Sequence, residues 1–328
     1  MHTPTQISVI LCTYNRAKSV AKTLESIVIQ SLPQSVRWEI VVIDNNSRDE
    51  TAKVVEEFRR RYPDLIRYAV EPQQGISNAR NAGIRMAQGD ILAFIDDDET
   101  ADTAWLKNLT ANLRGEQWAG AGGRVVPEWN SPPPRWWSSN SAFLVGPLAV
   151  FDADDRHEEL SNPPFGANMA FRRHMFGKYG GFRTDLGRSG ENLLGNEDTE
   201  FGRRLLAAGE RLRYEPSAVT YHPVEPFRLR RGYFLQWWFN KGRSDVLETG
   251  IRPGAKYILG FPLRLFRDAG VEVLHWVFAK QPSQRFVCHL KVWAYAGQAV
   301  ESYFQTRESR RKRQGPGAQS RGMAENAN

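Results

Sequence analysis

Short apolar segments alternate with helix-periodic segments through the first hundred residues of this chain. The apolar segments lie at residues 7–12, 40–43, 65–70 and 91–95. They are continuously apolar rather than alternating, which is typical of strands buried on both faces. Between them, apolar residues recur at helical spacing, and Ser47 and Glu50 have the spacing of a capping box before the second helix. This order predicts an α/β fold with a parallel sheet between layers of helices.

Polar residues follow three of the predicted strands directly. They are Thr13, Tyr14 and Asn15 after the first strand, Asp44 after the second, and Asp96, Asp97 and Asp98 after the fourth. Parallel sheets bind ligands beyond the carboxyl ends of their strands, so these side chains are expected to share one site. Three adjacent carboxylates repel one another unless a cation lies among them. The triplet therefore predicts a site for a divalent cation and phosphates, with an acidic turn before the next helix as the alternative.

The rhythm of strands and helices breaks between Glu128 and Phe165, where prolines, tryptophans and an acidic run are concentrated. A segment this long without regular periodicity is usually functional or mobile, and we expect it to be partly ordered and to cover a site. Regular structure is expected to return with a helix at about 196–208 and a strand at 211–221, which leads to His222.

After about residue 226 the composition becomes basic and aromatic, and Pro253, Pro262 and Pro282 interrupt short apolar helices. The chain is therefore expected to comprise a catalytic domain at 1–225, a basic, aromatic-rich helical region at 226–306 and a disordered tail at 307–328. Helices of this composition often lie in the interface of an anionic membrane. The alternative is a helical subdomain that packs on the catalytic sheet.

Composition narrows the class of protein further. Of 328 residues, 41% are hydrophobic and 25% charged, and the mean hydropathy is −0.52, which argues against a polytopic membrane protein. No run of about 20 apolar residues predicts a spanning helix. Cys12 and Cys288 form no disulfide framework or metal motif, and no secretory signal is evident, so a cytoplasmic protein is expected. The net charge of +7 favours an anionic partner, but nothing beyond charge supports nucleic acid, and we expect none.

Six short motifs occur in a fixed order along the chain. They are TYNR at 13–16, DNNS at 44–47, GISNARNAG at 75–83, DDD at 96–98, GF at 181–182 and NED at 196–198. Over residues 6–225 this ordered set resembles the family 2 glycosyltransferases, which have a GT-A fold with a Rossmann-like mixed sheet. The resemblance implies an inverting transferase that uses Mn²⁺ or Mg²⁺. It would move a sugar from a nucleotide-diphosphate donor, with a UDP-sugar favoured, to a hydroxyl of a glycan or a lipid-linked glycan.

The resemblance also implies roles for individual residues. Nucleotide binding is expected of Thr13, Tyr14, Arg16, Asp44, Arg80, Asp96 and Asp97, and metal binding of Asp96, Asp98 and His222. Asp198 is expected to be the general base, with Glu197 binding or orienting the acceptor. A carboxylate in the first turn of a helix is held in its ionised form by the helix dipole, as a base requires. Acceptor contacts are further expected of Asn168 and Trp237.

The sequence also bears on rival functions. A sugar nucleotidyltransferase would need a glycine-rich, lysine-bearing loop after the first strand, and a dehydrogenase would need GxGxxG there; the chain has TYNR instead. The QWW sequence at 236–238 lacks the spacing of the Gln-Arg-Trp element of processive family members, so a single transfer is expected. A non-catalytic sugar- or nucleotide-binding assembly protein on the same fold stays open as the alternative. A peripheral position on the cytoplasmic face of the inner membrane is expected if the helical region binds lipid.

Overall fold

The computed structural model describes residues 6–153, 159–190, 192–250, 256–258 and 261–313. The chain divides into two compact units, residues 1–233 and 234–328, and each is described by itself. The division lies a few residues beyond the expected boundary at 225.

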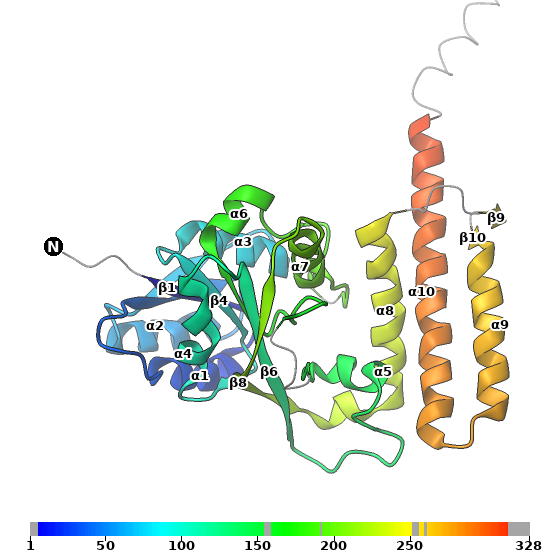
Figure 1. The fold of residues 1–328 in the computed structure, drawn as a ribbon, viewed down its shortest axis with the longest axis horizontal. Coiled ribbons are helices and arrows are strands. Elements are labelled where there is room, and N and C mark those ends of the chain that lie inside the picture. The colour runs from blue at the N-terminus through cyan, green and yellow to red at the C-terminus, as the bar shows by residue number, and fades with distance from the viewer. Residues whose placement is uncertain (1–5, 154–158, 191, 251–255, 259–260, 314–328) are drawn as a thin grey trace, which may run out of the picture. The chain divides into compact units, whose positions relative to one another are not determined.

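The first unit is built on one mixed, eight-stranded sheet with the order β3-β2-β1-β4-β7-β6-β8-β5 (Figure 1). The strands are β1 (Ile7–Thr13), β2 (Trp38–Asp44), β3 (Ile66–Val70), β4 (Ile91–Asp96), β5 (Thr100–Ala101), β6 (Gly120–Trp129), β7 (Asn168–Arg172) and β8 (Leu212–Val224). The first four strands are parallel, as predicted. β7 then runs antiparallel to both β4 and β6, which makes the sheet mixed.

Helices cover both faces of this sheet. They are α1 (Ala17–Val28), α2 (Thr51–Arg61), α3 (Ile76–Met86), α4 (Trp105–Thr110), α6 (Arg173–Tyr179) and α7 (Glu197–Ala207), and a further short helix, α5 (Ala142–Val145), lies in the segment between β6 and β7. Val9 and Leu11 of β1 belong to a core with α1, α2 and α4, whereas Ile10 and Cys12 belong to a second core with α3, α6 and α7. Successive side chains of a strand point to opposite faces, so a strand in this position must be apolar throughout.

The loops after β1 and β2 brace each other at the carboxyl edge of the sheet. Asn15 and Asn46 have positive φ angles of 52° and 67°, a conformation that asparagine tolerates better than most residues. The backbone N–H of Asn15 donates to the Ser47 hydroxyl, and the Asn15 side chain accepts from the N–H of Arg48. The expected capping box is therefore wrong. α2 begins at Thr51 with Glu50 as its N-cap, because tertiary contact recruits Ser47 to the neighbouring loop.

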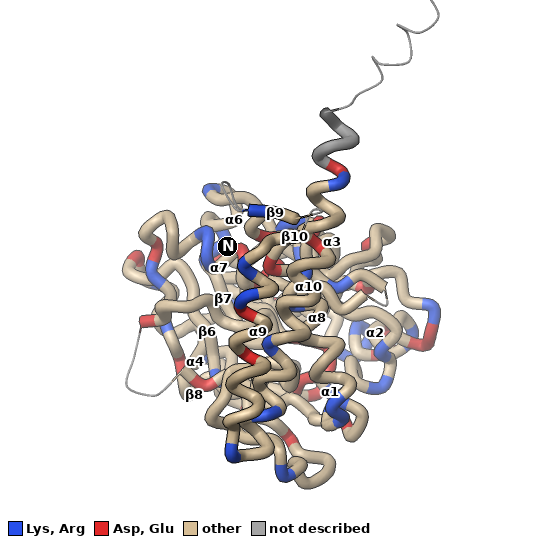
Figure 2. Tube along the Cα trace, turned by 90° about the vertical axis from the view of Figure 1, so that its right-hand side faces the viewer, with Lys and Arg blue, Asp and Glu red and all other residues tan. Residues whose placement is uncertain are grey.

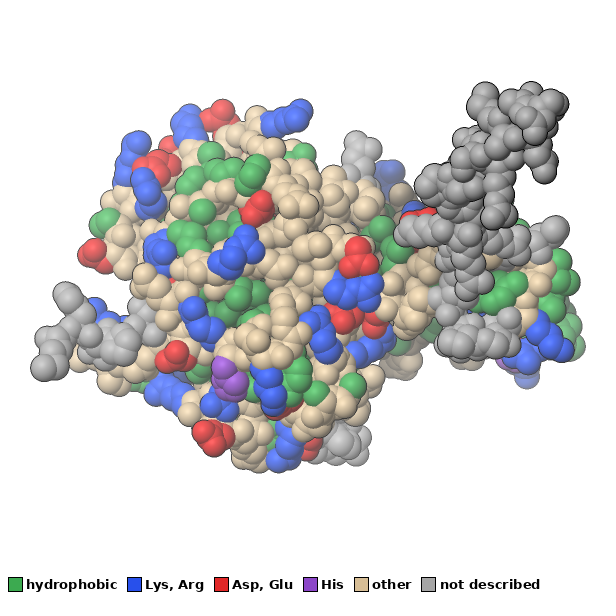
Figure 3. All heavy atoms as spheres, turned by 90° about the horizontal axis from the view of Figure 1, so that it is seen from above, with side chains coloured by type: hydrophobic (Ala, Val, Ile, Leu, Met, Phe, Trp, Pro, Cys, Tyr) green, Lys and Arg blue, Asp and Glu red, His purple; other side chains and the backbone are tan. Residues whose placement is uncertain are grey.

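The segment from Glu128 to Phe165, which we expected to be partly ordered, contains α5 and a short 3₁₀ helix, η2 (Gly146–Leu148). Part of its acidic run lies outside the described residues, which omit 154–158. β8 continues to Val224, so His222 lies inside the strand rather than after it. A further 3₁₀ helix, η3 (Pro226–Leu229), follows. Basic and acidic side chains are interspersed over the face of this unit that Figure 3 displays.

The second unit is helical, with α10 (Pro282–Arg313) between α8 (Arg231–Thr249) and α9 (Leu263–Phe278) (Figure 1). A minimal hairpin of β9 (Tyr257–Ile258) and β10 (Phe261–Pro262) precedes α9. α8 and α10 approach closely at Gly242 and Gly297, where a Cβ would lie about 2 Å from a backbone carbonyl oxygen of the other helix.

The expected prolines set helix starts here: Pro262 is the N-cap of α9 and Pro282 the first residue of α10. α10 continues to Arg313, past residue 307 where a disordered tail was expected, and residues 314–328 lie outside the described ones. Within the described ranges, none of the helices combines the length and the apolar character needed to cross a bilayer.

Candidate active site

The acidic triplet lies where the ends of three parallel strands meet. The strand register pairs Thr13 with Asp44 and Cys12 with Asp96, which brings the carboxyl ends of β1, β2 and β4 to one edge. Burial, with Asp98 beside it, raises the pKa of Asp97 to about 7. Glu99 is fully buried, and burial together with Asp96 holds its pKa well above the ordinary value. The cluster therefore resists full ionisation, as adjacent carboxylates do.

Asp98 is the most strongly paired member of the triplet. One of its oxygens, Oδ2, accepts from Arg16 Nη1 at 3.2 Å and from Arg228 Nη2 at 3.0 Å. Burial opposes ionisation of this carboxyl, but His222, Arg228 and Arg16 more than compensate, and its pKa is lowered. His222 is uncharged at neutral pH, so Arg16 and Arg228 account for the lowered pKa of Asp98 under physiological conditions.

His222 and Arg228 lie next to each other beside Asp98. Burial, reinforced by Arg228 and opposed by Asp98, lowers the pKa of His222 to about 4, so the imidazole is neutral at pH 7. Arg228 Nη1 lies 2.8 Å from His222 Nε2, which can then accept its hydrogen bond. The guanidinium of Arg228 thus bridges His222 and Asp98. Within the described residues, the buried Nδ1 of His222 has no hydrogen-bond partner.

Arg228 is a site residue that the sequence analysis missed. It was grouped with the basic, aromatic-rich region from 226 onward, yet it lies in the first unit and its side chain is 9% exposed. η3 turns the chain directly after β8 and returns Arg228 toward the strand it has just left. Its position only six residues after His222 was the available signal.

The donor atoms of Asp96, Asp98 and His222 are oxygens and an imidazole nitrogen, a set that suits Mn²⁺ and, less fully, Mg²⁺. In the described part of the chain, however, no three His, Cys, Asp or Glu side chains are gathered closely enough to hold an ion. The guanidinium of Arg228 lies between Asp98 and His222 instead. The residues fit a divalent cation chemically, and Arg228 must leave Asp98 and His222 for a cation to bind both.

A second cluster is centred on Arg80, which is 4% exposed. Its Nη1 donates to Glu197 at 2.6 Å, and its Nη2 donates to Asp96 at 3.2 Å. Burial disfavours the charged guanidinium, but Glu197, Asp96 and Asp198 raise its pKa well above the ordinary value. Arg80 therefore links the acidic triplet to α7, and in this structure its guanidinium is committed to carboxylates.

Glu197 and Asp198 are adjacent on α7 but differ in environment. Glu197 is buried against Arg80, and burial together with Asp198 raises its pKa to about 7. Asp198 is partly exposed, and its Oδ2 accepts from the backbone N–H of Gly166 at 2.6 Å. Its Oδ1 accepts from the N–H of Thr199 at the same distance. These bonds fix the orientation of the Asp198 carboxylate without covering it.

Gly166 allows this arrangement. A Cβ at this position would lie 2.6 Å from Arg80 Nη2 and 2.9 Å from Asp198 Oδ2, closer than real Cβ atoms approach. The glycine therefore lets the backbone approach the carboxylate and the guanidinium together. A glycine directly after a long segment without regular periodicity gives no sign of such a role, so Gly166 was not expected from the sequence.

Residues 8–180, more than half of the chain, match the model of the family described as Glycosyl transferase family 2. The chain belongs to this family. It is 29% identical over 254 residues to the glucosyl-dolichyl phosphate glucuronosyltransferase of Haloferax volcanii, covering 74% of this chain and 78% of that one. It is also 29% identical to the succinoglycan biosynthesis protein ExoM of Rhizobium meliloti, with 73% of each chain covered. The protein is a glycosyltransferase.

Solved structures agree on the fold. The mannosyltransferase PcManGT from Pyrobaculum calidifontis, in complex with GDP-Man and Mn²⁺, superposes with a TM-score of 0.56 at 19% identity, covering 92% of this chain and 76% of that one. GalNAc-T7 with UDP, GalNAc and Mn²⁺ superposes with a TM-score of 0.52 at 15% identity, covering 77% and 53%. This glycosyltransferase therefore has the GT-A fold that the motifs implied.

Two further residues of this glycosyltransferase, Asn168 and Trp237, were expected to contact the acceptor. Asn168 is 1% exposed: its Oδ1 accepts from Trp105 Nε1, and its Nδ2 donates to the carbonyls of Arg124 and Ala218. The Asn168 side chain therefore links α4, β6 and β8, and its acceptor contact stays a prediction. Trp237 lies on α8 in the second unit, and its acceptor contact stays a prediction.

The remaining residues expected to bind the nucleotide gather at the same edge. Thr13 is buried and Tyr14 half-buried, while Asp44 accepts from the Tyr68 hydroxyl at 2.9 Å and from the N–H of Ser47. Tyr68, on β3, was not anticipated, because a tyrosine in a strand gives no sign of which carboxylate it will meet. Its hydrogen bond and burial fix Asp44 at the end of β2.

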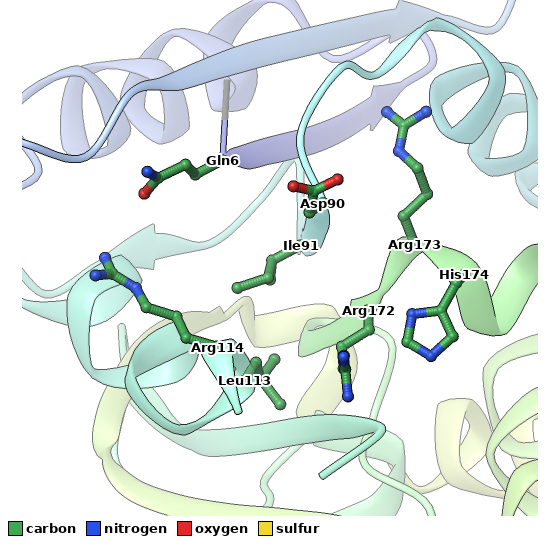
Figure 4. Close-up of a pocket in the computed structure, with 8 residues that line it drawn as sticks. All are labelled: Gln6, Asp90, Ile91, Leu113, Arg114, Arg172, Arg173 and His174. Carbon is green, nitrogen blue, oxygen red and sulfur yellow. The ribbon is translucent and has the colours of Figure 1, made fainter. Parts of the chain in front are cut away.

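The cavity of about 560 Å³ in Figure 4 lies elsewhere. Its lining includes Gln6 just before β1, Ile91 at the start of β4 and Arg172 at the end of antiparallel β7. These positions mark the amino ends of the parallel strands, opposite the acidic triplet. The cavity is therefore separate from the candidate active site.

Proposed function

We propose that this family 2 enzyme is an inverting glycosyltransferase in which Asp198 is the general base. The observation that carries the proposal is the division between the two acids at the start of α7. Glu197 is buried and paired with Arg80, whereas Asp198 is partly exposed and oriented by the N–H of Gly166. An oriented, accessible carboxylate suits removal of a proton from an acceptor hydroxyl.

In this mechanism the acceptor oxygen attacks the anomeric carbon as its proton passes to Asp198, and the bond to the nucleotide diphosphate breaks. A single displacement inverts the configuration at that carbon. Glu197 holds Arg80 in place, and Arg80 in turn fixes Asp96, so Glu197 is a positioning residue in this scheme. Its contact with the acceptor, expected from the family resemblance, would require Arg80 to release it.

We place the donor at the carboxyl ends of β1, β2 and β4. Thr13, Tyr14 and Asp44 are proposed to hold the base, with Asp96 and Asp97 toward the ribose and diphosphate. Arg16 reaches Asp98 at this edge, and a guanidinium there suits phosphate oxygens. A UDP-sugar is favoured, since Asp44 can accept an imide N–H. Arg80 is proposed to act through Asp96 rather than on the nucleotide itself.

Asp96, Asp98 and His222 are proposed to hold Mn²⁺ or Mg²⁺. When bound, the cation would offset negative charge on the departing nucleotide diphosphate. Support comes from the donor atoms described above and from the Mn²⁺ present in the two solved structures with this fold.

The acceptor is proposed to be a glycan or a lipid-linked glycan, reached at the cytoplasmic face of an anionic membrane. The Haloferax volcanii relative is named for a dolichyl phosphate substrate, which supports a lipid-linked acceptor. Trp237, which is partly exposed on α8, is proposed to contribute to this contact.

Calorimetric titration of UDP, GDP and dTDP, with and without Mn²⁺, tests the donor site. We expect one nucleotide to bind the wild type in a metal-dependent way and to lose that dependence in Asp98→Ala. Product stereochemistry, read by NMR of the anomeric proton with that nucleotide's sugars, then tests inversion. Absence of nucleotide binding under all conditions would contradict the assignment of the donor site, and retention of configuration would contradict the role of Asp198.

A further inference from the structure

The outward side of α9 is apolar over most of its length. Seven large hydrophobic side chains on it are more than a third exposed: Leu263, Phe266, Val271, Val273, Leu274, Val277 and Phe278. Phe278 is 79% exposed and Phe266 60%. At about 100° per residue these positions fall within one half of the helix, so they form a continuous face. We call these seven residues the α9 face.

The opposite side of α9, which packs on α10, is more polar than the side left exposed. Leu265 and Glu272, seven residues apart, are its buried positions. The Glu272 carboxylate accepts from Lys291 of α10 at 2.9 Å. A water-soluble helix ordinarily buries its apolar stripe and exposes its charges. α9 instead leaves most of its large apolar side chains exposed, so its contact with α10 does not explain its hydrophobicity.

Basic residues accompany the α9 face. Figure 2 marks basic residues along α9. The exposed Arg267 lies within the face, where it pairs with Asp268 at 2.8 Å, and Lys280 and the exposed Arg285 follow the carboxyl end of α9. Residues 234–328 contain 15 Lys and Arg against 7 Asp and Glu, a net charge of +8, whereas residues 1–233 contain 29 against 30. The chain's entire positive excess therefore belongs to the unit that carries this face.

We propose that the α9 face inserts into the headgroup region of an anionic lipid bilayer, with α9 parallel to the membrane plane. This deepens the proposed function, on which it rests, by naming the element that makes the lipid contact. Sixteen residues give a helix about 24 Å long, shorter than the roughly 30 Å apolar core of a bilayer, which excludes a spanning orientation. Long basic side chains such as that of Arg267 can place their charges among lipid phosphates while their stems stay in the apolar layer.

Charge decides between a bilayer and a second copy of this chain. A symmetric pair of α9 faces would bring two units of charge +8 together, and the repulsion would oppose the contact. An anionic bilayer offers the complementary sign and an apolar layer below it. Both features of the surface, its hydrophobicity and its charge, are then satisfied together.

Vesicle flotation with the full-length protein tests the proposal, using vesicles of phosphatidylcholine alone and with phosphatidylglycerol. We expect binding to the mixed vesicles only, weakened by salt. Leu274→Asn combined with Phe278→Asn should lower the partition constant by roughly 100-fold, since two large apolar side chains no longer enter the lipid. Arg267→Glu with Lys280→Glu should lower it on the order of tenfold.

A matched control replaces two exposed apolar residues of the first unit, Ile29→Asn with Val70→Asn, and should leave vesicle binding unchanged. UDP titration of every variant separates this proposal from the donor site, because the α9 variants should bind nucleotide as the wild type does. Wild-type protein that ignores anionic vesicles, or α9 variants that bind them normally, would overturn the proposal. So would an α9 variant whose main change is from dimer to monomer in sedimentation.

Discussion

The two units of this glycosyltransferase differ in where they place charged and hydrophobic side chains. The first unit buries its apolar residues in two cores and gathers charged groups in its candidate active site, among them Arg80, Glu197 and Asp98. The second unit contains eleven of the fifteen exposed large hydrophobic residues among those described, in less than a third of the chain. Its Glu272–Lys291 ion pair, in which only Glu272 is buried, joins two helices instead.

Ion pairs therefore have two separate roles in this chain. In the first unit, several carboxylates share a few guanidinium groups, so the cluster can exchange partners when a ligand arrives. In the second unit, the Glu272–Lys291 ion pair joins α9 to α10, and large hydrophobic side chains remain exposed.

Asp198→Asn should lower kcat by roughly a thousandfold, because an amide cannot accept the acceptor's proton. UDP affinity and vesicle binding should stay close to those of the wild type, since neither uses this carboxylate. Steady-state kinetics with calorimetry on the same preparation checks both. Activity within tenfold of the wild type would remove Asp198 from the role of base.

Gly166→Ala should lower kcat by about 10- to 100-fold, because the new Cβ displaces Arg80 and Asp198 from their positions. Gly115→Ala, where a Cβ meets nothing within 4 Å, is the matched control and should be neutral. A normal Gly166→Ala enzyme would show that the close approach is not required for catalysis.

Gly242→Ala tests the packing of α8 on α10 in the second unit. Its Cβ would clash with the Ala294 carbonyl, so α8 and α10 must separate at a cost of about 1–3 kcal/mol in unfolding free energy. Nucleotide affinity should not change, whereas Gly232→Ala on the same helix should affect neither property. Chemical denaturation and calorimetry test this, and loss of nucleotide binding in Gly242→Ala would contradict the independence of the two units.

His222 should make stability depend on pH in the absence of metal. Its folded pKa of about 4 is below its unfolded value of about 6.5, so the unfolded chain takes up a proton first as the pH falls. Stability is therefore present above pH 6.5 and lost toward pH 4, by about 2 kcal/mol at pH 5. Denaturation of wild type and His222→Asn with a chelator, at pH 7.5 and pH 5, measures this. An unchanged difference between them would show that His222 is not held neutral.

Arg228→Ala should raise the affinity for Mn²⁺ alone by roughly fivefold, because the guanidinium no longer competes for Asp98 and His222. Arg230→Ala, an exposed neighbour, is the control. Calorimetric titration of Mn²⁺ without nucleotide reads this directly. Weaker Mn²⁺ binding in Arg228→Ala would show that Arg228 supports the ion instead of replacing it.

Much of the fold of the first unit could be predicted from the sequence, because the patterns that indicate its strands lie in short stretches of neighbouring residues. Continuous apolar strands such as 7–12 and 91–95 report burial on both faces, and the polar residues that end them mark the ligand edge. The capping box at Ser47 failed for the opposite reason. Its spacing was correct, but Asn15 on another loop offered the hydroxyl a better partner. Asn168 is a related case, since a motif position cannot show that a helix and two strands will take up its side-chain hydrogen bonds.

The sequence by itself determined the alternation of strands and helices, the family, and the acidic and polar groups at the strand ends, because each is written in neighbouring residues. Only the tertiary structure decided which charges meet. Arg80 reaches Glu197 across 117 positions, and Arg228 reaches Asp98 across 130. It also decided that α9 turns its apolar side outward, since helical periodicity defines a face but not the neighbour it meets. Such pairings depend on how distant segments pack, and that is settled by the whole fold.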